Sequence, residues 1–401
     1  MVRFSHFADC HLGGWRQEEL QKLNFESFQK AVDFSISEKV DFILIAGDLF
    51  DSAYPPIEIL KETFAEFRKI KNSNIPVYII AGSHDFSASG KTFLDVLEKA
   101  GFVKNVEKYE VLENQSIILK PCIDNKTGIS IYGYSGKKSG MEIDDLKKVK
   151  INEINQFTIL MIHTTISDVV GSIPMDSIDK MSLPLANYYA LGHIHQVFEK
   201  QESNSIFSYP GPTFPNNFQE LADLKSGSIN LVEVVNGKTK IKNIKFPIKD
   251  VVYKEMEINN GLTATEKIIL EIDKINLNEK IFLLKLKGTL TQGKSGDIRF
   301  NEIEEFVKKK NPLIFLRNIS SLKTIETEIE LEQEGLENME NIEEKIIEEY
   351  SKKNPADFNK FIHPLMNSLS IEKNEDEKSS IFESRLIDDL NKILEIPEEL
   401  S

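Results

Sequence analysis

The chain has 401 residues, of which 40% are hydrophobic and 28% charged, and it carries a formal net charge of −15. This length predicts about two or three domains with a large core. No run of about 18 apolar residues occurs, which argues against a membrane-spanning helix, and the start MVRFSHFAD does not resemble a signal peptide. Because there are only two cysteines, Cys10 and Cys122, we expect no disulfide framework and a cytoplasmic location.

The negative charge is concentrated near the C-terminal end. Residues 326–401 contain 22 acidic and 8 basic side chains, which leaves 42 acidic and 41 basic side chains in residues 1–325. The first 325 residues are therefore nearly neutral and can still form a basic groove. The total charge does not exclude a polyanionic partner.

The first part of the chain, residues 1–245, alternates short apolar runs with amphipathic helical patterns. The runs predict buried strands at 3–8, 41–46, 76–81, 129–134, 157–162 and 188–192, and the patterns predict helices at 25–39 and 57–70. This alternation is typical of a layered α/β domain. Residues 250–325 predict a smaller α+β domain, and residues 326–401 predict an acidic helical tail with a loop near 370–380.

Metal-binding residue types follow five of the predicted strands. They are Asp9 and His11, Asp48, Ser83 with His84 and Asp85, His163, and His193 with His195. The carboxyl ends of strands are where sites form in open α/β sheets, and mixed carboxylate and imidazole ligands suit divalent metals. One histidine after a strand is usually structural, but five of the seven histidines stand at these ends. The pattern predicts a divalent metal site, whereas His6, inside the first strand, is expected to be structural.

The exact sequences of these motifs narrow the predicted metal site to one protein family. In order they are ADCHLGG (8–14), AGDLFDSAYP (46–55), GSHDFS (82–87), IHTT (162–165), ALGHIHQ (190–196) and YPGPT (209–213). This set resembles the calcineurin-like metallophosphoesterases and, within them, the meiotic recombination eleven / SbcD nucleases of double-strand-break repair. The resemblance implies a layered α/β metallophosphoesterase sandwich, with two central sheets flanked by helices. It also implies a small DNA-contacting cap domain (250–325) and a helical acidic C-terminal tail (326–401).

The resemblance further implies two metal ions, usually manganese, with magnesium as a poorer substitute. The first ion would be bound by Asp9, His11, Asp48 and His195, and the second by Asp48, Ser83, His163 and His193, so that Asp48 bridges them. A hydroxide held between the ions would attack phosphorus. His84 would steady the developing charge or protonate the leaving 3′-oxygen, and Asp85 would support an imidazole from behind.

Ser83 departs from the family pattern, which usually has asparagine at this position. An amide oxygen is a better neutral ligand than a hydroxyl group and reaches further. Ser83 would therefore bind the second metal weakly or through a water molecule, and the second metal is less well supported than the first.

Residues 288–295 read GTLTQGKS and match the phosphate-binding loop pattern. A working loop of this kind begins a helix at its Lys and Ser and needs a later strand that ends in Asp. Here Gly296 and Asp297 follow, and the next helical pattern begins near Phe300, so we expect a strand-to-helix loop in the cap domain. Basic residues around it could contact DNA phosphates or form an ordinary solvated face. They are Lys285, Lys287, Lys294 and Arg299.

The family works on DNA ends with a coiled-coil ATPase of the SMC type, called SbcC in bacteria. Two apolar helical faces in the tail are candidates for docking it: Ile342, Ile346 and Tyr350, and Phe382, Leu386 and Leu390. The alternative is that these helices pack on the rest of the chain. The family also implies a homodimer, for which residues 57–70 and 92–102 could serve, although their apolar faces could equally be core.

The residues and the resemblance together predict a manganese-dependent DNA nuclease, and the resemblance alone implies a 3′–5′ exonuclease on double strands and an endonuclease on single strands. Two alternatives stay open. One is a phosphomonoesterase or cyclic-nucleotide phosphodiesterase of the same superfamily. The other is a catalytically weak scaffold that docks DNA ends to an ATPase, and Ser83 gives that alternative some weight.

Overall fold

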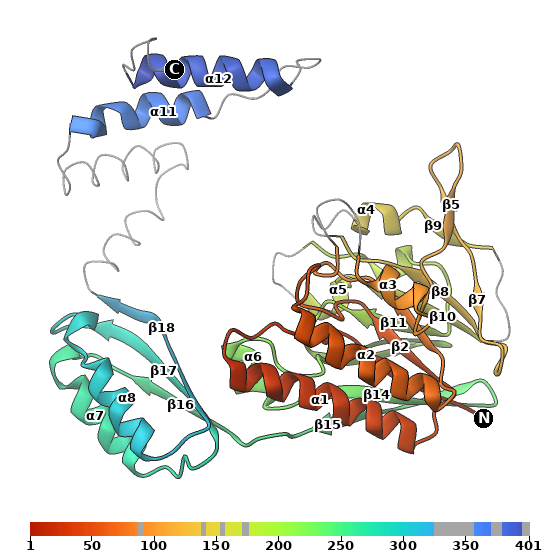
Figure 1. Ribbon diagram of the computed structural model, residues 1–401, viewed down its shortest axis with the longest axis horizontal. Helices are drawn as coiled ribbons and strands as arrows, with labels where there is room; N and C mark the ends of the chain where they lie inside the picture. Colours follow the sequence, from red (N-terminus) through yellow and green to blue (C-terminus); the bar gives the residue numbers. More distant parts are fainter. Residues whose placement is uncertain are drawn as a thin grey trace.

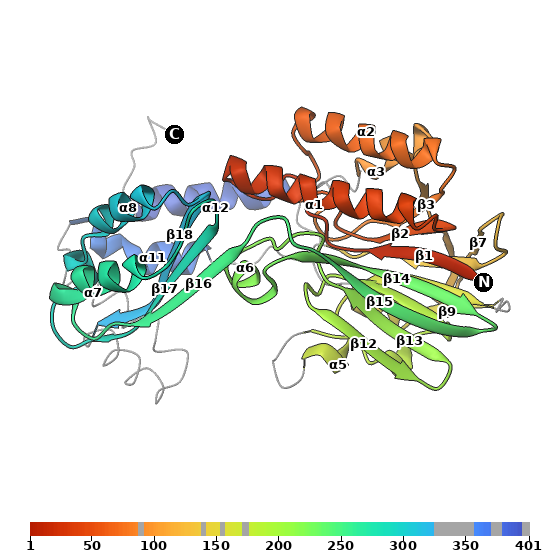
Figure 2. The ribbon, with the colours of Figure 1, turned by 90° about the horizontal axis from the view of Figure 1, so that it is seen from below.

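The computed structural model describes residues 1–86, 92–137, 142–152, 157–170, 176–324, 357–369 and 379–394. Two six-stranded sheets form the first domain, in the orders β15-β14-β1-β2-β3-β4 and β12-β13-β11-β10-β8-β7. Figure 2 shows them as separate layers, with helices α1 and α2 over the outer face of the first sheet. The predicted α/β sandwich with two central sheets is confirmed.

The first sheet contains β1 (Val2–Phe7), β2 (Phe42–Ala46), β3 (Val77–Ile80), β4 (Lys104–Asn105), β14 (Gly227–Val235) and β15 (Lys238–Phe246). It is accompanied by α1 (Glu18–Ser37), α2 (Ile57–Asn72) and α3 (Leu94–Lys99). Strands β1, β2, β3 and β4 pair in parallel, whereas β14 runs antiparallel to β1. Helix α1 begins earlier than the predicted residue 25, because Leu20 and Leu23 extend its buried face.

The second sheet contains β7 (Cys122–Ile123), β8 (Ser130–Tyr134), β10 (Thr158–His163), β11 (Tyr188–Gly192), β12 (Val197–Glu202) and β13 (Ser205–Pro210). Its surroundings include α4 (Glu142–Leu146), α5 (Ser167–Val170) and η1 (Lys180–Ser182), and a small sheet of β5 (Tyr109–Val111), β6 (Ile117–Leu119) and β9 (Val149–Ile151). All six strands predicted from apolar runs form at the expected places. The sequence reading missed strands such as β12 and β15, because one face of each is polar and exposed.

Alternation along the strands builds separate apolar layers. Phe4, Phe42 and Tyr188 belong to the cluster between the two sheets, where the rings of Phe4 and Phe42 stack at 4.9 Å. Neighbouring residues on the same strands face α1 and α2 and pack with Phe28 and Phe67. These layers fix the two sheets rigidly, so the strand ends at their shared edge are held in place.

His6 lies inside the layer between the sheets, as expected of a structural residue. It is fully buried, and its Nδ1 atom lies 2.9 Å from the hydroxyl oxygen of Tyr188. Burial lowers the pKa of His6 to about 3, so this imidazole stays neutral near pH 7.

The cap domain is a second, smaller unit, seen at the lower left in Figure 1. It comprises β16 (Val251–Glu257), α7 (Gly261–Asp273), β17 (Ile281–Leu290), η2 (Ser295–Asp297), α8 (Phe300–Lys309) and β18 (Ile314–Thr324). Its three strands are parallel, and α7 and α8 cover one face of the sheet through an apolar cluster that includes Ile268, Leu284 and Ile303. The boundary that we propose near residues 245–250 falls between β15 and β16.

The loop at 288–295 adopts the expected strand-to-helix form. Gly288 and Leu290 are still part of β17, and Ser295 begins only the short 3₁₀ turn η2. Helix α8 begins at Phe300, as predicted. Lys294 therefore does not lead directly into an α-helix, which a phosphate-binding loop requires.

The described part of the tail comprises η4 (Asp357–Phe361), α11 (Ile362–Leu369) and α12 (Ser379–Ile393). Helices α11 and α12 lie side by side (Figure 1). The expected docking residues Ile342, Ile346 and Tyr350 lie outside the described residues. Among the helices of the described segments, none combines the length and the apolar character needed to cross a bilayer.

Candidate metal centre

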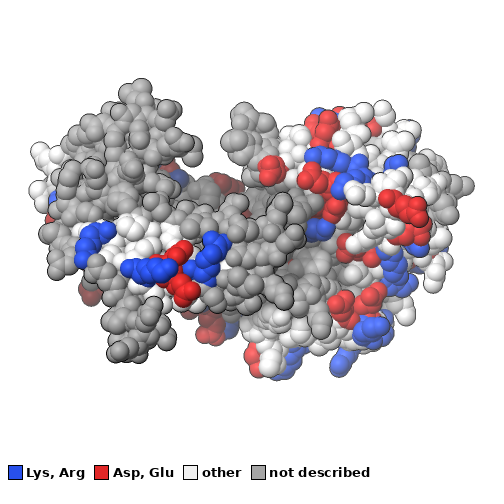
Figure 3. Space-filling view, turned by 90° about the horizontal axis from the view of Figure 1, so that it is seen from above, with Lys and Arg blue, Asp and Glu red and all other residues white. Residues whose placement is uncertain are grey.

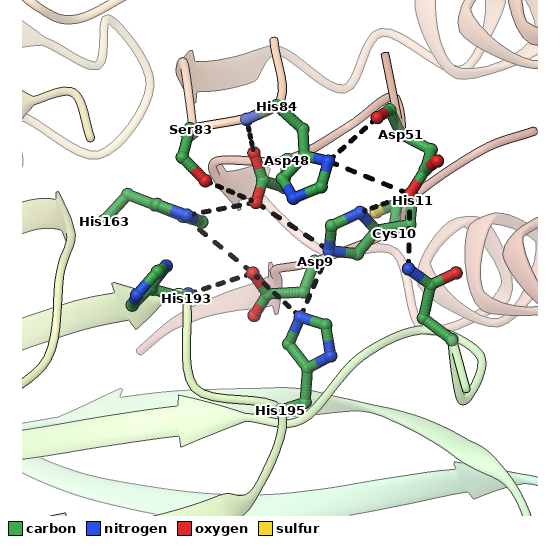
Figure 4. Close-up of polar contacts among 12 residues, drawn as sticks. Asp9, Cys10, His11, Asp48, Asp51, Ser83, His84, His163, His193 and His195 are labelled. Atoms are coloured by element: carbon green, nitrogen blue, oxygen red, sulfur yellow. Dashed lines mark hydrogen bonds and ion pairs between the residues drawn. The ribbon is translucent and has the colours of Figure 1, made fainter. Parts of the chain in front are cut away.

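The five predicted strand ends meet at one place (Figure 4). Strands β1, β2 and β3 are neighbours in the first sheet, and β10 and β11 are neighbours in the second. Each pair of neighbours is parallel, so their carboxyl ends lie at the same edge. The two sheets bring their ends together, which places Asp9 and Asp48 from one sheet opposite His163 from the other.

Several residues at this edge have strained backbone conformations. Four residues have positive φ angles, which residues other than glycine rarely adopt. They are Asp9 (50°), His11 (43°), Asp48 (50°) and His193 (94°). Gly47 also has a positive φ of 91°, and a Cβ atom there would collide with the ring of His163. Such strain persists only where the surrounding fold enforces it, and it is typical of functional sites.

The four residues of the first implied ligand set lie together. The Nε2 atoms of His11 and His195 are 3.1 Å apart. His11 Nε2 lies 3.7 Å from Asp48 Oδ2, and His195 Nε2 lies 3.8 Å from Asp9 Oδ1. Two imidazole nitrogens that face each other so closely suit a shared cation, since each can offer it a lone pair.

Two residues of the second set lie beside the same carboxylate, and the third packs against one of them. Asp48 Oδ2 lies 3.2 Å from His163 Nε2 and 3.5 Å from Ser83 Oγ. The ring of His193 packs edge-on against that of His163, with centroids 5.2 Å apart, and its backbone N–H donates to Asp9 Oδ1 at 2.9 Å. Asp48 Oδ2 therefore has residues of both implied sets beside it.

Buried acceptors at the centre fit a cation. Within the described segments, the buried Asp9 Oδ2 makes no hydrogen bond, and the buried His163 Nε2 makes none beyond its ion-pair contact with Asp48 Oδ2 at 3.2 Å. His163 Nδ1 is 2.9 Å from the carbonyl oxygen of Ala46 and donates to it, which leaves Nε2 as the free ligand atom. Three groups have ligand atoms within 4.8 Å of one another: Asp9, His11 and His195; His11, Asp48 and His84; and Asp9, Asp48 and His163. His193 is outside these groups of described residues.

The shifted pKa values of His163 and Asp48 also show that this site favours a positive charge beside its carboxylates. Burial would lower the pKa of His163, but Asp48 and Asp9 raise it to about 10. Burial would raise the pKa of Asp48, but the charge of His163 outweighs it and lowers this pKa. A divalent ion would take the place of the protons on these imidazoles, because metal and proton compete for the same lone pairs.

His84 and Asp85 have separate surroundings. His84 is 47% exposed, and its Nδ1 atom lies 2.8 Å from the carbonyl oxygen of Asp51. Asp85 is buried and accepts from the backbone N–H groups of Gly82, Leu49 and Phe50 at 2.9, 3.3 and 3.1 Å. The resemblance implies an imidazole partner for Asp85. Its hydrogen bonds instead tie the loop after β3 to the loop after β2.

The structure adds residues that we did not predict from the sequence. Asp51 Oδ1 lies 3.2 Å from His11 Nδ1, and Glu220 Oε1 lies 2.9 Å from His195 Nδ1. Asn216 contacts both carboxylates, donating from Nδ2 to Asp51 and from its backbone N–H to Glu220. Asp51 is part of the AGDLFDSAYP motif, which could have suggested it, whereas Asn216 and Glu220 are far away in sequence from any predicted strand end.

The four basic residues proposed for DNA contacts lie on the cap domain. Lys287 pairs with Glu255 at 2.5 Å, and Lys285 lies 3.7 Å from the same carboxylate. Arg299 pairs with Glu266 and Glu302 at 2.5 and 2.7 Å. Lys294 is exposed in the loop before η2. Acidic partners within the cap thus offset the charge of three of the four.

Comparison with known proteins identifies relatives of the chain. Residues 2–197 match the family described as calcineurin-like phosphoesterase. The chain is 29% identical to the DNA double-strand break repair protein Mre11 of Methanococcus maripaludis, over 94% of this chain and 96% of that protein. It is 32% identical to the Methanocaldococcus jannaschii protein of the same name, over 53% and 56% of the two chains. The corresponding Archaeoglobus fulgidus protein is 26% identical, over 83% and 77%.

Proposed function

We propose that this chain, whose residues 2–197 match the calcineurin-like phosphoesterase family, is a metal-dependent nuclease that processes DNA ends in double-strand-break repair, as the names of its archaeal relatives suggest. The observation that carries the proposal is the convergence of carboxylates and imidazoles from five strand ends around the buried Asp9 Oδ2, which makes no hydrogen bond to any described residue. Such a centre suits hydrolysis of phosphodiesters, and the names of the relatives point to DNA as the substrate.

The proposed ligand sets assign each side chain a role. Asp9, His11, Asp48 and His195 would hold one ion, and Asp48, Ser83, His163 and His193 would hold the other. When bound, two manganese ions would neutralise charge on the phosphodiester oxygens and lower the pKa of a water molecule. The chain supplies the geometry, since the Ala46 carbonyl orients His163 and the carboxylate of Glu220 orients His195.

His84 is proposed to act on the leaving group. Its Nδ1–H donates to the Asp51 carbonyl, which fixes the ring and leaves Nε2 to exchange a proton with substrate. The ring contacts His11 edge-on with centroids 4.8 Å apart, so it is adjacent to the ligands and still open to solvent. A protonated His84 in this place would donate to the 3′-oxygen as its bond to phosphorus breaks.

Digestion of an end-labelled linear duplex tests the proposed activity. We expect cleavage with Mn²⁺, weaker cleavage with Mg²⁺, and none after the metal is removed with a chelator. Hydrolysis of phosphomonoesters or cyclic nucleotides without DNA cleavage would identify a different enzyme of the family. Binding of DNA ends without cleavage of any of these substrates would identify a scaffold.

Replacing Ser83 by Asn should strengthen the second metal set. The hydroxyl oxygen of Ser83 lies 3.5 Å from Asp48 Oδ2, and an amide oxygen on a longer side chain reaches further toward the ion. The Ser83→Asn variant is expected to need less Mn²⁺ than the wild type for half-maximal cleavage. Ser83→Ala is the matched control and should need more. A Ser83→Asn variant with an unchanged or higher Mn²⁺ requirement would remove position 83 from the proposed ligand set.

We propose that the cap contacts DNA, although ion pairs within the cap engage three of its four candidate basic residues. Figure 3 shows acidic and basic side chains interspersed over the described part of one face. Lys285, Lys287 and Arg299 have acidic neighbours, so a phosphate would have to compete with Glu255, Glu266 and Glu302. Lys294 in the loop before η2 is therefore the contact that we expect to contribute first.

We further propose that the tail binds a coiled-coil ATPase of the SMC type. On α12, Phe382, Leu386 and Leu390 are half-buried, and α11 packs beside this helix. Ile387 on the same helix is 56% exposed. An exposed branched apolar side chain beside a half-buried row is the kind of face that a partner helix covers.

Charged substitutions on α12 test the docking role. The double variant Leu386→Glu, Leu390→Glu should lose co-purification with the ATPase and keep the DNA cleavage of the isolated chain. Because that variant also disturbs the contact with α11, Ile387→Glu provides the milder test at an exposed position. Retention of the partner by both folded variants would place docking elsewhere in the chain.

We also propose that the chain forms a homodimer, with helices α2 and α3 at the interface. Tyr54 and Ile57 near the start of α2 are 76% and 79% exposed, and Val96 on α3 is 45% exposed. Other apolar side chains of these helices, including Phe67 and Leu94, are buried in the core. Each helix thus presents one apolar side to the core and leaves further apolar side chains on the surface for a second copy.

A further inference from the structure

One short stretch of chain, Asn216–Leu224, contacts both the candidate metal centre and the cap domain. We call it the link segment; it includes helix α6 (Phe218–Leu224). Its N-terminal end lies beside Asp51, and α6 contacts strand β16 of the cap. The segment therefore touches two parts of the molecule that carry different proposed roles.

The site-facing side of the link segment contacts one histidine of the first ligand set directly and reaches a second through Asp51. Glu220 Oε1 lies 2.9 Å from Nδ1 of His195, and Asp51 Oδ1 lies 3.2 Å from Nδ1 of His11. Asn216 joins the two carboxylates, because its Nδ2 donates to Asp51 at 3.2 Å and its backbone N–H donates to Glu220 Oε2 at 2.7 Å. The orientation of both imidazoles thus depends on one connected set of hydrogen bonds.

This set is closely packed against the loop that follows β1. A Cβ atom on Gly14 would lie 2.5 Å from Asn216 Oδ1 and 2.9 Å from Asp51 Oδ1, so only glycine fits there. Trp15 donates from its indole N–H to the carbonyl oxygen of Pro215 at 2.9 Å. The start of the link segment is therefore held by the same loop that carries Asp9 and His11.

The opposite side of the link segment packs on the cap. Leu221 and Ala222 of α6 belong to a buried apolar cluster with Ile281 and Leu283 of β17. Leu283 is fully buried on this face of the cap sheet, whereas its neighbour Leu284 is fully buried on the other face, under α7 and α8. The cap therefore rests on the helix that carries Glu220.

We propose that the link segment couples the seating of the cap to the first metal site, with Glu220 and Asn216 as positioning residues for His195 and His11. The proposal rests on the proposed function in that these two histidines are taken as ligands. A displaced cap moves α6, and a displaced α6 withdraws the acceptors that orient the two rings. Partners behind a ligating histidine set its direction, so their loss weakens metal affinity.

The coupling has a reciprocal consequence. If the seated cap favours metal binding, then bound metal favours the seated cap by the same factor. Backbone amides of α6 and β17 should therefore exchange hydrogen more slowly when Mn²⁺ is present. In Glu220→Gln, which cannot accept from both His195 and the N–H of Asn216, this difference should shrink.

Mn²⁺ titration calorimetry on the full chain, without DNA, tests the proposal with a matched pair of variants. Leu283→Ala and Leu284→Ala remove the same atoms from adjacent buried positions, but only Leu283 faces the link segment. We expect Leu283→Ala to weaken the affinity of the first site by roughly 2- to 30-fold, and Leu284→Ala to leave it unchanged. Glu220→Ala is the positive control, with an expected loss of roughly 10- to 100-fold.

Smaller substitutions at the same two positions keep the test usable if the alanine variants unfold. Leu283→Val and Leu284→Val form a second matched pair, and a melting curve of each variant shows whether it is folded at the temperature of the titration. Equal changes within a folded pair, or no change in either member, would overturn the coupling and leave the proposed function intact. A wild-type chain that binds no Mn²⁺ would instead overturn the proposed function and the coupling with it.

Discussion

Replacing Asp48 by Ala is expected to abolish Mn²⁺-dependent DNA cleavage, with a loss of roughly a thousandfold or more. Asp48 is the carboxylate common to both proposed ligand sets and lies beside His163, His11 and Ser83. Its loss removes a ligand from each ion and leaves His163 without its nearest carboxylate. Both effects act at the point where negative charge develops on the phosphodiester.

The measurement is the rate of cleavage of an end-labelled duplex at saturating Mn²⁺, with metal content determined in parallel. Asp48→Asn is a useful companion, because its amide oxygen can still accept from the backbone N–H of His84. The matched control is Asp124→Asn, a buried aspartate that accepts from the hydroxyl group of Tyr78 away from the proposed ligands. Normal cleavage by a folded Asp48→Ala variant would contradict the two-metal mechanism.

The second large effect is expected from His84→Ala, which should keep the metals and the affinity for DNA but lose roughly 100- to 10,000-fold in turnover. His84 is half exposed, and its Nδ1–H already donates to the Asp51 carbonyl. That hydrogen bond fixes the ring as a proton donor next to the ligands. Neither proposed ligand set needs His84 to be complete.

Elemental analysis, DNA binding and single-turnover rates on the same preparation separate these roles. His84→Gln is the companion variant, since its side-chain amide can donate to the Asp51 carbonyl and cannot transfer a proton near pH 7. Both variants should retain the wild-type manganese content. A manganese content that falls together with the rate would make His84 a ligand, as its closeness to His11 and Asp48 also allows.

The residues of the candidate centre could be found from the sequence because of the geometry of parallel strands. Asp9, Asp48 and His163 each end or follow a short buried strand, and the carboxyl ends of such strands share one edge. Apolar runs predicted the strands, so the polar residues after them could be placed together without knowing the order of the strands. The same runs predicted a layered α/β domain, and the family resemblance implied its two central sheets.

The outer residues of the site could not be found in this way. Glu220 meets His195 only because α6 folds back against the end of β11, and nothing in the local sequence of α6 indicates that contact. The contacts of Asn216 with Asp51 and Glu220 likewise depend on the fold and cannot be seen in the local sequence. Asp85 shows the converse problem, since its place in the motif was evident but its backbone partners at residues 49 and 50 depended on the packing of two loops.

Charge pairing on the cap depended on strand register. Lys285 and Lys287 read as free basic residues along the chain, yet the parallel pairing of β16 with β17 sets both beside Glu255. Register between strands that are separated by a helix is fixed by packing of the whole domain. The seating of the cap on α6 was likewise beyond the sequence, since Leu221 and Leu283 are ordinary apolar residues until the two units meet.

Anomalous diffraction from crystals of the full chain grown or soaked with Mn²⁺ would locate the bound ions. We expect two manganese peaks per chain, on either side of the Asp48 carboxylate. The first would be bound by Asp9, His11 and His195, and the second by His163 and His193. A single peak, or manganese bound away from Asp48 in crystals that diffract well enough to show ordered ions, would contradict the proposed two-metal centre.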